Sequence, residues 1–412
     1  MGLFDRKTSK DKEIKGNNNG DAANKKEKKK TLKPVLKKEP KIKKAKAIPP
    51  FVTIDIGCCE IKIMVASHNS GLITVTHAAS EILPENAIDD GKIIEEGYVA
   101  NCIRNMMSEN NIKVSNAVIT MNSTEITQRE IIVPKVPNNE LTNLVTFEMG
   151  KYLPINPSAY AIQYNIIEEL EGDSGGTSLR VNVCAMPKSI AKGYLDLLSK
   201  LGLNPMALNM HSTSVAKLIG VESNRESPLL KGSSLVVDMG HEHFNAMMFN
   251  DGKLIFNRLI ETGGSKIDEV IMRIADVDLA EARRIKRYNL SKINALDMYK
   301  SYLAARGSSD NSYNKEELIS QETVVIYNGW ITDIESVIKY YLSRNSENVV
   351  DTIYIDGGSS YIKGIDELIE NRLNIRTKRL NNFNCLKGIL CDGNRNEDIS
   401  KYVNNIGATI RI

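Results

Sequence analysis

Several features are missing from this sequence of 412 residues, and their absence narrows the possible functions. No run of eighteen apolar residues occurs, so no segment is expected to cross a membrane as a helix. The basic N-terminus is not followed by the apolar core that a secretory signal requires. The six cysteines lack paired CxxC spacing, and we interpret them as reduced thiols of a cytosolic protein. A metal held by Cys385 and Cys391 is the alternative to two separate thiols.

Positive charge is concentrated in the first 47 residues, which hold 17 Lys and Arg against 6 Asp and Glu. The net charge of the whole chain is only +3, so the remainder is mildly acidic. Few large apolar residues and many mutually repelling lysines predict a disordered basic tail over 1–47. Such a tail suits a peripheral contact with an anionic membrane surface, or acts only as a solubilising leader. No aromatic residues alternate with its lysines, so no nucleic-acid partner is expected.

Beyond the tail, one pattern occurs twice. Residues 51–77 read FVTIDIGCCEIKIMVASHNSGLITVTH, and residues 235–258 read LVVDMGHEHFNAMMFNDGKLIFNR. Each copy has an apolar run that ends in Asp-x-Gly, a second run, a polar turn (HNSG or NDG) and a third run. Such patterns predict three strands joined by tight turns, because glycine and small polar residues accept a positive φ. The repetition predicts a duplicated α/β domain.

The two Asp-x-Gly turns have the chemistry of a polyphosphate site. If they face each other across a cleft, their backbone N–H groups bind phosphate, and Asp55 and Asp238 hold a hydrated Mg²⁺ between them. Glycine pairs also precede two predicted helices, in ETGGSKIDEVIMRIA (261–275) and TIYIDGGSSYIKGIDELIENRL (352–373), and suit phosphate or nucleoside packing. No GxxxxGK[ST] segment occurs, which excludes a P-loop. The alternative is that both turns are structural hairpin turns only.

These elements, in this order, resemble the actin-like ATPase superfamily, and within it the family of type IV pilus assembly protein PilM, a relative of the cell-division protein FtsA. The resemblance covers about 50–412 and includes the closing YVNNIGATIRI. It implies an α/β fold with two duplicated lobes around a nucleotide cleft, and ATP and Mg²⁺ as ligands. The nucleotide-binding residues that it implies are Asp55, Gly57, Cys58, Cys59, Lys62, Asp238, Gly240, His241, Gly263, Gly264, Lys266, Gly357, Gly358 and Ser359, with Asp55 and Asp238 contacting the metal through water.

The segment 82–158 resembles the small additional subdomain of that family, from its DGKI turn to its KYLP end. Its own pattern predicts a helix with an apolar stripe, the strands SNAVITMN and TQREIIVP, and a second helix from about Asn139 to Tyr152. A hairpin around a GDSGG turn follows. The expected domains are a basic tail (1–47), a first lobe (48–81 and 159–233), an inserted partner-binding subdomain (82–158), a second lobe (234–395) and a C-terminal helix that returns to the first lobe (396–412).

Both phosphate turns depart from the superfamily pattern. Cys58 and Cys59 stand where Ser or Thr usually follows DIG, and thiols are weaker hydrogen-bond donors. A redox role for this pair is an alternative. Lys62 either approaches phosphate or is a solvated strand residue. A metal site at His241 and His243 has no evident third ligand, so surface histidines are the expected interpretation.

Hydrolysis is the step most affected by these departures. The predicted connecting helix, NPMALNMHSTSVAKLIG (204–220), has Asn209 and His211 where relatives place an acidic residue that orients the attacking water. His211 is the remaining weak candidate for a catalytic base. The sequence therefore predicts ATP binding with slow or absent turnover.

The leading functional interpretation is a cytoplasmic ATP-binding scaffold of the type IV pilus assembly complex, which serves twitching motility. The resemblance implies docking at the inner face of the membrane, on the N-terminal cytoplasmic peptide of a PilN-type protein, and allows homo-oligomers. One alternative is an FtsA-like filament-forming division protein, although the sequence does not close on a basic amphipathic segment. Another is a small-molecule kinase of the same superfamily, which requires a carboxylate base that 204–220 lacks.

Overall fold

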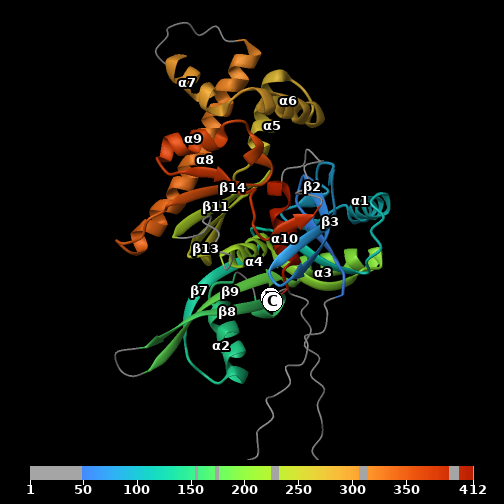
Figure 1. Ribbon diagram of the computed structural model, residues 1–412, viewed down its shortest axis with the longest axis vertical. Coiled ribbons are helices and arrows are strands. Elements are labelled where there is room, and N and C mark those ends of the chain that lie inside the picture. The colour runs from blue at the N-terminus through green and yellow to red at the C-terminus, as the bar shows by residue number, and fades with distance from the viewer. Residues whose placement is uncertain are drawn as a thin grey trace, which may run out of the picture.

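The computed structural model describes residues 49–153, 156–171, 176–223, 232–305, 314–388 and 399–411. The predicted basic tail (1–47), most of the GDSGG turn and Cys391 lie outside these residues. The described chain forms two lobes, each built on one mixed sheet, with helices between the sheets and on their outer faces (Figure 1). None of the described helices has both the length and the hydropathy that a membrane crossing needs.

The first lobe contains a six-stranded sheet in the order β10-β6-β1-β2-β3-β16. All five residues of its central strand β1 are buried, as expected for a strand whose two faces are both covered. One face packs against α1 (Glu96–Glu109) and α3 (Lys188–Leu201). The strands are β1 (Val52–Ile56), β2 (Glu60–Asn69), β3 (Leu72–Ile82), β6 (Asn116–Met121), β10 (Asn204–Met210) and β16 (Leu386–Gly388).

The second lobe contains a five-stranded sheet in the order β13-β12-β11-β14-β15. Its strands are β11 (Ser233–Met239), β12 (Phe244–Asn250), β13 (Lys253–Ile260), β14 (Thr352–Asp356) and β15 (Thr377–Arg379). Its outer face packs against helices α5 (Ser265–Ala275), α8 (Lys315–Arg344) and α9 (Ile365–Leu373).

Two helices form a layer between the lobes. One apolar cluster joins α4 (His211–Ser223) and α10 (Val403–Thr409) to buried residues of both sheets, among them Met64 of β2 and Met247 of β12. In Figure 1 these helices lie near the centre of the molecule. The two sheets are therefore held together by a shared core.

The predicted duplication is confirmed. Strands β1-β2-β3 and β11-β12-β13 are both antiparallel meanders, and each first strand also pairs in parallel, β1 with β6 and β11 with β14. The predicted turns place Ser70 and Gly71 at φ 50° and 76°, and Asp251 and Gly252 at φ 45° and 75°. Two successive positive φ values match the right-handed twist of the flanking strands.

A separate three-stranded sheet, in the order β7-β9-β8, projects from the first lobe (Figure 1). Helix α2 covers one of its faces, where Val145 and Met149 belong to one buried cluster with Val181 and Val183. We name this unit, residues 127–187, the small subdomain. It consists of β7 (Thr127–Pro134), α2 (Asn138–Gly150), the short 3₁₀ helix η1 (Pro157–Ala159), β8 (Tyr160–Glu171) and β9 (Thr177–Pro187).

The bounds expected for the insert, 82–158, differ from those of the small subdomain. Helix α1 and strand β6 belong to the first lobe, because β6 lies between β1 and β10 and pairs with both in parallel. The ribbon of β4 (Ile88–Asp89) and β5 (Lys92–Ile93) at the DGKI turn precedes α1 and also lies outside the small subdomain. Conversely, β8 and β9, expected in the first lobe, complete the small sheet. The pattern located the elements but not their pairing partners.

Residues 204–220 do not form one helix. Residues 204–210 form β10, in which Leu208 pairs with Ile119 of β6, and only the part from His211 onward is helical. The last four residues of β10 are all buried, which a strand inside a covered sheet explains and an amphipathic helix does not. Asn209, expected on the connecting helix, is therefore a strand residue.

The C-terminal part of the described chain packs on the first lobe. The 3₁₀ helix η4 (Ile399–Tyr402) leads into α10, which contacts α4, β1 and β2. A Cβ atom on Gly407 would lie 2.0 Å from the carbonyl oxygen of Ser214, so only glycine permits this approach of α10 to α4. Strand β16, inside the range expected for the second lobe (234–395), pairs with β3 of the first sheet.

Most of 265–344 is helical, with α6 (Leu279–Lys292) and α7 (Ala295–Ala305) between α5 and α8. Asp278 and Asn314 cap α6 and α8, because each side chain accepts a hydrogen bond from a backbone N–H of the first turn. Trp330 is buried as expected, with ring centroids 5.0 Å from Phe244 and 5.4 Å from Tyr327.

Candidate functional site

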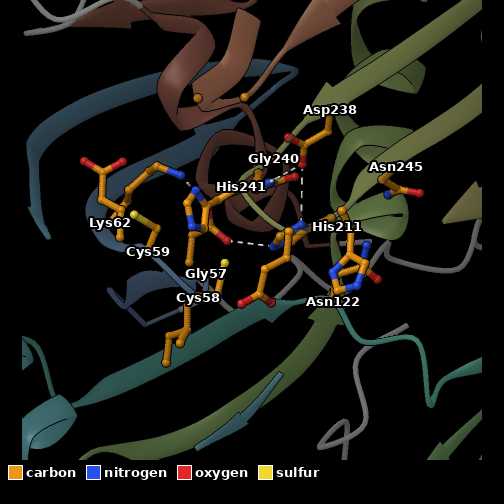
Figure 2. Close-up of a pocket in the computed structure, with 18 of the residues that line it drawn as sticks. Gly57, Cys58, Cys59, Lys62, Asn122, His211, Asp238, Gly240, His241 and Asn245 are labelled. Carbon is orange, nitrogen blue, oxygen red and sulfur yellow. Dashed lines mark hydrogen bonds and ion pairs between the residues drawn. The ribbon is translucent and has the colours of Figure 1, made fainter. Parts of the chain in front are cut away.

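A cleft between the lobes brings the two Asp-x-Gly turns together (Figure 2). Asp55 and Asp238 are each the next-to-last residue of a central strand, so the carboxyl ends of β1 and β11 meet at the cleft. Ligands of α/β proteins bind at such strand ends. The predicted site residues that line the cleft are Asp55, Gly57, Cys58, Cys59, Lys62, His211, Asp238, Gly240, His241, Gly357 and Gly358.

Four predicted residues are not among those lining the cleft: Gly263, Gly264, Lys266 and Ser359. The N–H of Gly264 and the Oγ of Ser359 both donate to the carbonyl of Gly240, at 3.2 and 3.0 Å. These two residues therefore shape the second turn from behind. Lys266 is exposed, and its Nζ lies 3.1 Å from Oε1 of Glu269, so the structure does not bring it into the cleft.

The two turns are closed by the same hydrogen bond. The N–H of Gly57 donates to the carbonyl of Glu60 at 3.1 Å, and the N–H of Gly240 donates to the carbonyl of His243 at 3.1 Å. A Cβ atom at position 240 would lie 2.5 Å from that carbonyl oxygen, so a side chain there would open the turn. Backbone geometry is thus repeated at the two sites.

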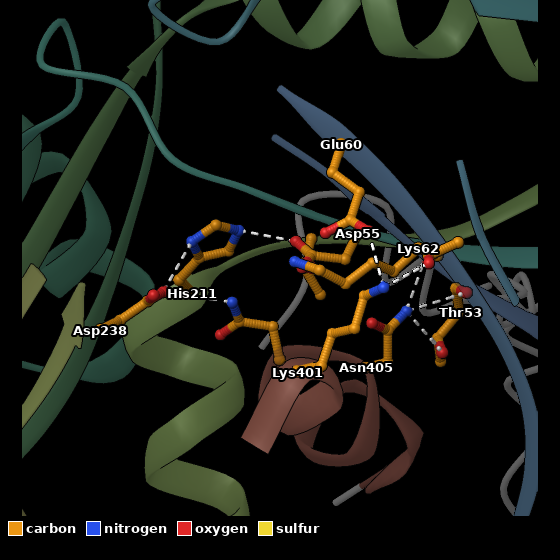
Figure 3. A network of polar contacts seen from close by, with 11 residues as sticks. Thr53, Asp55, Glu60, Lys62, His211, Asp238, Lys401 and Asn405 are labelled. Carbon is orange, nitrogen blue, oxygen red and sulfur yellow. Dashed lines mark hydrogen bonds and ion pairs between the residues drawn. The ribbon is translucent and has the colours of Figure 1, made fainter. Parts of the chain in front are cut away.

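His211 lies between the two aspartates (Figure 3). Its Nε2 is 2.8 Å from Oδ1 of Asp55, and its Nδ1 is 3.5 Å from Oδ2 of Asp238. Asp55 also accepts a hydrogen bond from Thr120 Oγ1 at 2.8 Å and from Lys62 Nζ at 3.3 Å. His211, the first residue of α4, thereby connects a strand end of the first lobe to one of the second.

Burial and charge shift the pKa values of this group in opposite directions. Burial lowers the pKa of His211, but the carboxylates of Asp55 and Asp238 outweigh burial and raise it to about 10. Burial raises the pKa of Asp55, but Lys62 and His211 together hold it below its ordinary value. Burial lowers the pKa of Lys62, but Asp55 outweighs burial and raises it. The group therefore contains opposite charges that neutralise one another.

The imidazole of His211 lies where the sequence predicted a hydrated Mg²⁺ shared by Asp55 and Asp238. Both oxygens of Asp55 already accept hydrogen bonds, and the imidazole of His211 lies between the two carboxylates. Mg²⁺ keeps several waters and binds phosphate oxygens, so in this cleft Asp55 and Asp238 would contact it only through water, beside the imidazole of His211. Within the described ranges, no three His, Cys, Asp or Glu side chains are grouped so as to hold a metal ion directly.

A third carboxyl group, Asp356, was not predicted from the sequence. It ends β14, pairs in parallel with Asp238 and is 1% exposed. Its Oδ1 has no hydrogen-bond partner among the described residues. Burial, followed by the charge of Asp238, raises the pKa of Asp356 well above its ordinary value. Its position directly before Gly357 was the signal that could have identified it.

The C-terminal segment contributes a second unpredicted part of the site. Asn404 Nδ2 donates to Oδ2 of Asp238 at 3.3 Å. Its neighbour Asn405 donates to the carbonyls of Thr53 and Lys62, at 3.2 and 3.1 Å. Adjacent asparagines on α10 thus contact both lobes at the cleft. Two asparagines inside an apolar helix, in YVNNIGATIRI, were the available signal.

Cationic side chains surround Asp268 behind the second turn. Lys286 Nζ lies 2.6 Å from Oδ2 of Asp268 and donates to the carbonyl of Gly264 at 3.0 Å. His241 Nδ1 lies 3.9 Å from the same carboxylate. Burial, then the charges of Lys286 and Arg283, lower the pKa of His241 to about 3, so this imidazole is neutral at physiological pH.

The adjacent thiols of Cys58 and Cys59 both line the cleft. Burial, and then the Glu242 carboxylate, raise the pKa of Cys58 well above its ordinary value. Burial also raises the pKa of Cys59. Protonated thiols are poor nucleophiles, so these values give no support to a redox role.

Two protein-family models match the sequence of this chain. The model of the family described as type IV pilus assembly protein PilM matches residues 53–298, and that of cell division protein FtsA matches residues 235–393. A curated relative, the cell division protein FtsA of Streptococcus pneumoniae serotype 2, is 21% identical in an alignment of 365 positions that covers 80% of this chain and 74% of that protein.

A solved structure described as the PilM-PilN type IV pilus biogenesis complex superposes with a TM-score of 0.70 and 20% identity, covering 87% of this chain and 97% of that chain. The chain therefore has the actin-like ATPase fold. Because the first family model spans more than half of its length, this chain belongs to the family of type IV pilus assembly protein PilM.

Proposed function

We propose that this chain is an ATP-binding scaffold of the type IV pilus assembly complex, held at the cytoplasmic face of the membrane by its partners. The observation that carries the proposal is the meeting of both Asp-x-Gly turns and the Gly357-Gly358 pair in one cleft, in a chain of the PilM family. The basic tail (1–47) adds a peripheral contact, because lysine clusters are attracted to anionic membrane surfaces.

Nucleotide binding is supported by the backbone of the cleft. The N–H groups of Gly57 and Gly240 close the two turns, so phosphate would be bound by other backbone N–H groups of these turns. The cationic group around Asp268 lies behind the second turn. Turnover is expected to be slow. His211, the candidate base, has both ring nitrogens directed at carboxylates and no free nitrogen to accept a proton from water.

The small subdomain is the proposed docking site for the N-terminal peptide of a PilN-type protein. Strand β8 is an edge strand of its sheet, and an extended peptide can add to such an edge through main-chain hydrogen bonds. Ile166 and Ile167 on β8 are 50% and 45% exposed, and Phe147 on neighbouring α2 is 67% exposed. These exposed apolar side chains can contact alternate residues of a peptide that pairs with the edge.

Replacing Ile166 and Ile167 together by Asp tests this docking site. We expect the affinity for a fluorescent N-terminal peptide of a PilN-type protein to fall at least about tenfold, or roughly 1.4 kcal/mol, in a polarisation titration. ATP binding should be unchanged, because the cleft contains neither residue. The matched control is Val349→Asp, at a residue of the second lobe that is 57% exposed.

The same titration separates the scaffold from the FtsA-like division protein, an alternative favoured by the match to the FtsA model over 235–393. A division protein would show no specific affinity for the peptide and would form filaments that sediment with ATP. Peptide binding that survives both Asp substitutions would move the docking site away from β8.

A further inference from the structure

We propose that Asn245 and Asn404 are ligand-binding residues of the cleft, and that their side-chain amides bind the phosphate end of the nucleotide. The inference rests on the nucleotide site of the proposed function. It adds two neutral side chains, one from the second lobe and one from the C-terminal segment, to a site whose predicted nucleotide-binding residues included no asparagine.

Asn245 is a buried amide without a protein partner. It lies on β12 opposite Asp238, it lines the cleft, and it is 2% exposed. Neither its Oδ1 nor its Nδ2 has a hydrogen-bond partner among the described residues. Because both amide atoms are unpartnered, exchanging the assignment of oxygen and nitrogen would leave the amide equally unsatisfied. Figure 2 shows this side chain in the group that surrounds the cleft.

An amide in this position destabilises the fold. The first six residues of β12 are all buried, and Asn245 is the one polar residue among them. Nearly all buried polar groups of proteins are hydrogen-bonded, because burying a polar group without a bond costs free energy that an apolar side chain would not cost. An asparagine kept here at the expense of stability is typical of a functional site, where a ligand supplies the missing partner.

Asn404 brings a second amide to the same carboxyl group from the C-terminal segment. It lies on α10, lines the cleft and is 7% exposed. Its Nδ2 donates to Oδ2 of Asp238 at 3.3 Å, whereas its Oδ1 has no partner among the described residues. The next residue, Asn405, holds this turn of α10 against the first lobe through the carbonyls of Thr53 and Lys62. The two amides therefore flank Asp238.

The neighbourhood of the second turn identifies the part of the ligand that these amides meet. Asn245 follows two residues after His243, whose carbonyl closes the turn with the N–H of Gly240. A phosphate bound by other backbone N–H groups of that turn would lie at the start of β12. The Nδ2 of Asn245 can then donate to a phosphate oxygen. The Oδ1 of Asn404 only accepts hydrogen bonds, so its partner is a water that accompanies the phosphate.

Asn245→Leu tests the first amide, because leucine has a similar size and no polar atom. We expect the dissociation constant of ATP, measured by calorimetry on the full chain in excess Mg²⁺, to rise at least about tenfold. The urea midpoint of the same variant should shift upward, because the unsatisfied amide is gone. Adenosine, which has no phosphate, should bind the variant and the unmodified chain equally.

Ser234→Ala is the matched control. Its hydroxyl is another buried polar group without a partner among the described residues, on β11 outside the cleft lining. This variant should also show a higher urea midpoint, and its affinity for ATP should be unchanged. Asn404→Ala tests the second amide independently and should weaken ATP binding at least about threefold, again without an effect on adenosine.

Two results would overturn the inference for Asn245. One is an ATP affinity of Asn245→Leu within twofold of the unmodified chain, which would mean that the amide is satisfied by water alone. The other is a variant that loses both stability and affinity, or does not fold, which would make Asn245 a structural residue. Unchanged ATP affinity in Asn404→Ala would remove that residue from the site. Absence of ATP binding to the unmodified chain would instead refute the nucleotide site of the proposed function.

Discussion

Asp55 and Asp238 occupy the same position in two copies of one strand-turn-strand unit, and their partners across the antiparallel pair differ. Asp55 of β1 lies opposite Lys62 of β2, whereas Asp238 of β11 lies opposite Asn245 of β12. The register is the same in both lobes because the turn length fixes it. The charge is not the same, because a lysine occurs in one copy and an amide in the other.

The parallel neighbours differ as well. Beside Asp55 stands the hydroxyl of Thr120, and beside Asp238 stands the carboxyl group of Asp356. The first turn has a lysine of its own sheet beside its carboxylate in addition to His211, while the second depends entirely on residues from elsewhere, His211 and Asn404. The two copies therefore have the same backbone pairing but different charges around their aspartates.

The largest expected effect comes from breaking the first turn's own ion pair. Lys62→Met leaves the buried carboxylate of Asp55 without its lysine, and we expect a loss of about 3–5 kcal/mol in the free energy of unfolding, measured by urea denaturation. Lys266→Met, which removes an exposed pair with Glu269, should cost less than about 0.5 kcal/mol. If the two variants lost the same free energy of unfolding, the buried ion pair at Asp55 would contribute no more to stability than the exposed pair at Glu269.

A smaller effect of opposite sign is expected in the second turn. The raised pKa of Asp356 means that the folded chain keeps a proton that the unfolded chain releases above about pH 4, so this group destabilises the fold as pH rises. Asp356→Asn cannot ionise and should be more stable than the unmodified chain by roughly 1–3 kcal/mol at pH 7, with little difference at pH 4. Urea unfolding curves of both chains between pH 4 and 8 measure this difference in the free energy of unfolding.

Asp238→Asn is the matched variant for that series. It loses the charge that His211 and Asn404 contact, and it should therefore be less stable at pH 7. A gain of stability in both variants would contradict the separate roles assigned to these neighbouring carboxyl groups.

The smallest effect concerns the hydroxyl of the first turn. Thr120→Val keeps the β-branched shape of this buried strand residue and removes its hydrogen bond to Asp55, for an expected cost of about 1 kcal/mol in urea denaturation. Thr146→Val on exposed α2 removes only a bond to a carbonyl of its own helix and should change stability by less than about 0.5 kcal/mol. If Thr146→Val costs as much as Thr120→Val, the bond to Asp55 contributes nothing beyond an ordinary helix contact.

Local signals predicted part of this molecule well. The turns at Ser70-Gly71 and Asp251-Gly252 have the predicted positive φ, because that requirement depends only on the residues in the turn. Predictions failed where pairing partners were distant in the sequence. The apolar residues before His211 fit a helix or a buried strand equally well. They form a strand because they pair with β6, which lies about 90 residues earlier in the sequence.

The sequence by itself determined the two Asp-x-Gly turns, their strands and the family, since each depends on short runs of residues in a fixed order. Only the tertiary structure decided that His211 and Asn404, from segments far apart in the chain, meet at Asp238. Contacts between buried polar groups of different lobes depend on the packing of both sheets on the shared helical layer, which no local run of residues specifies.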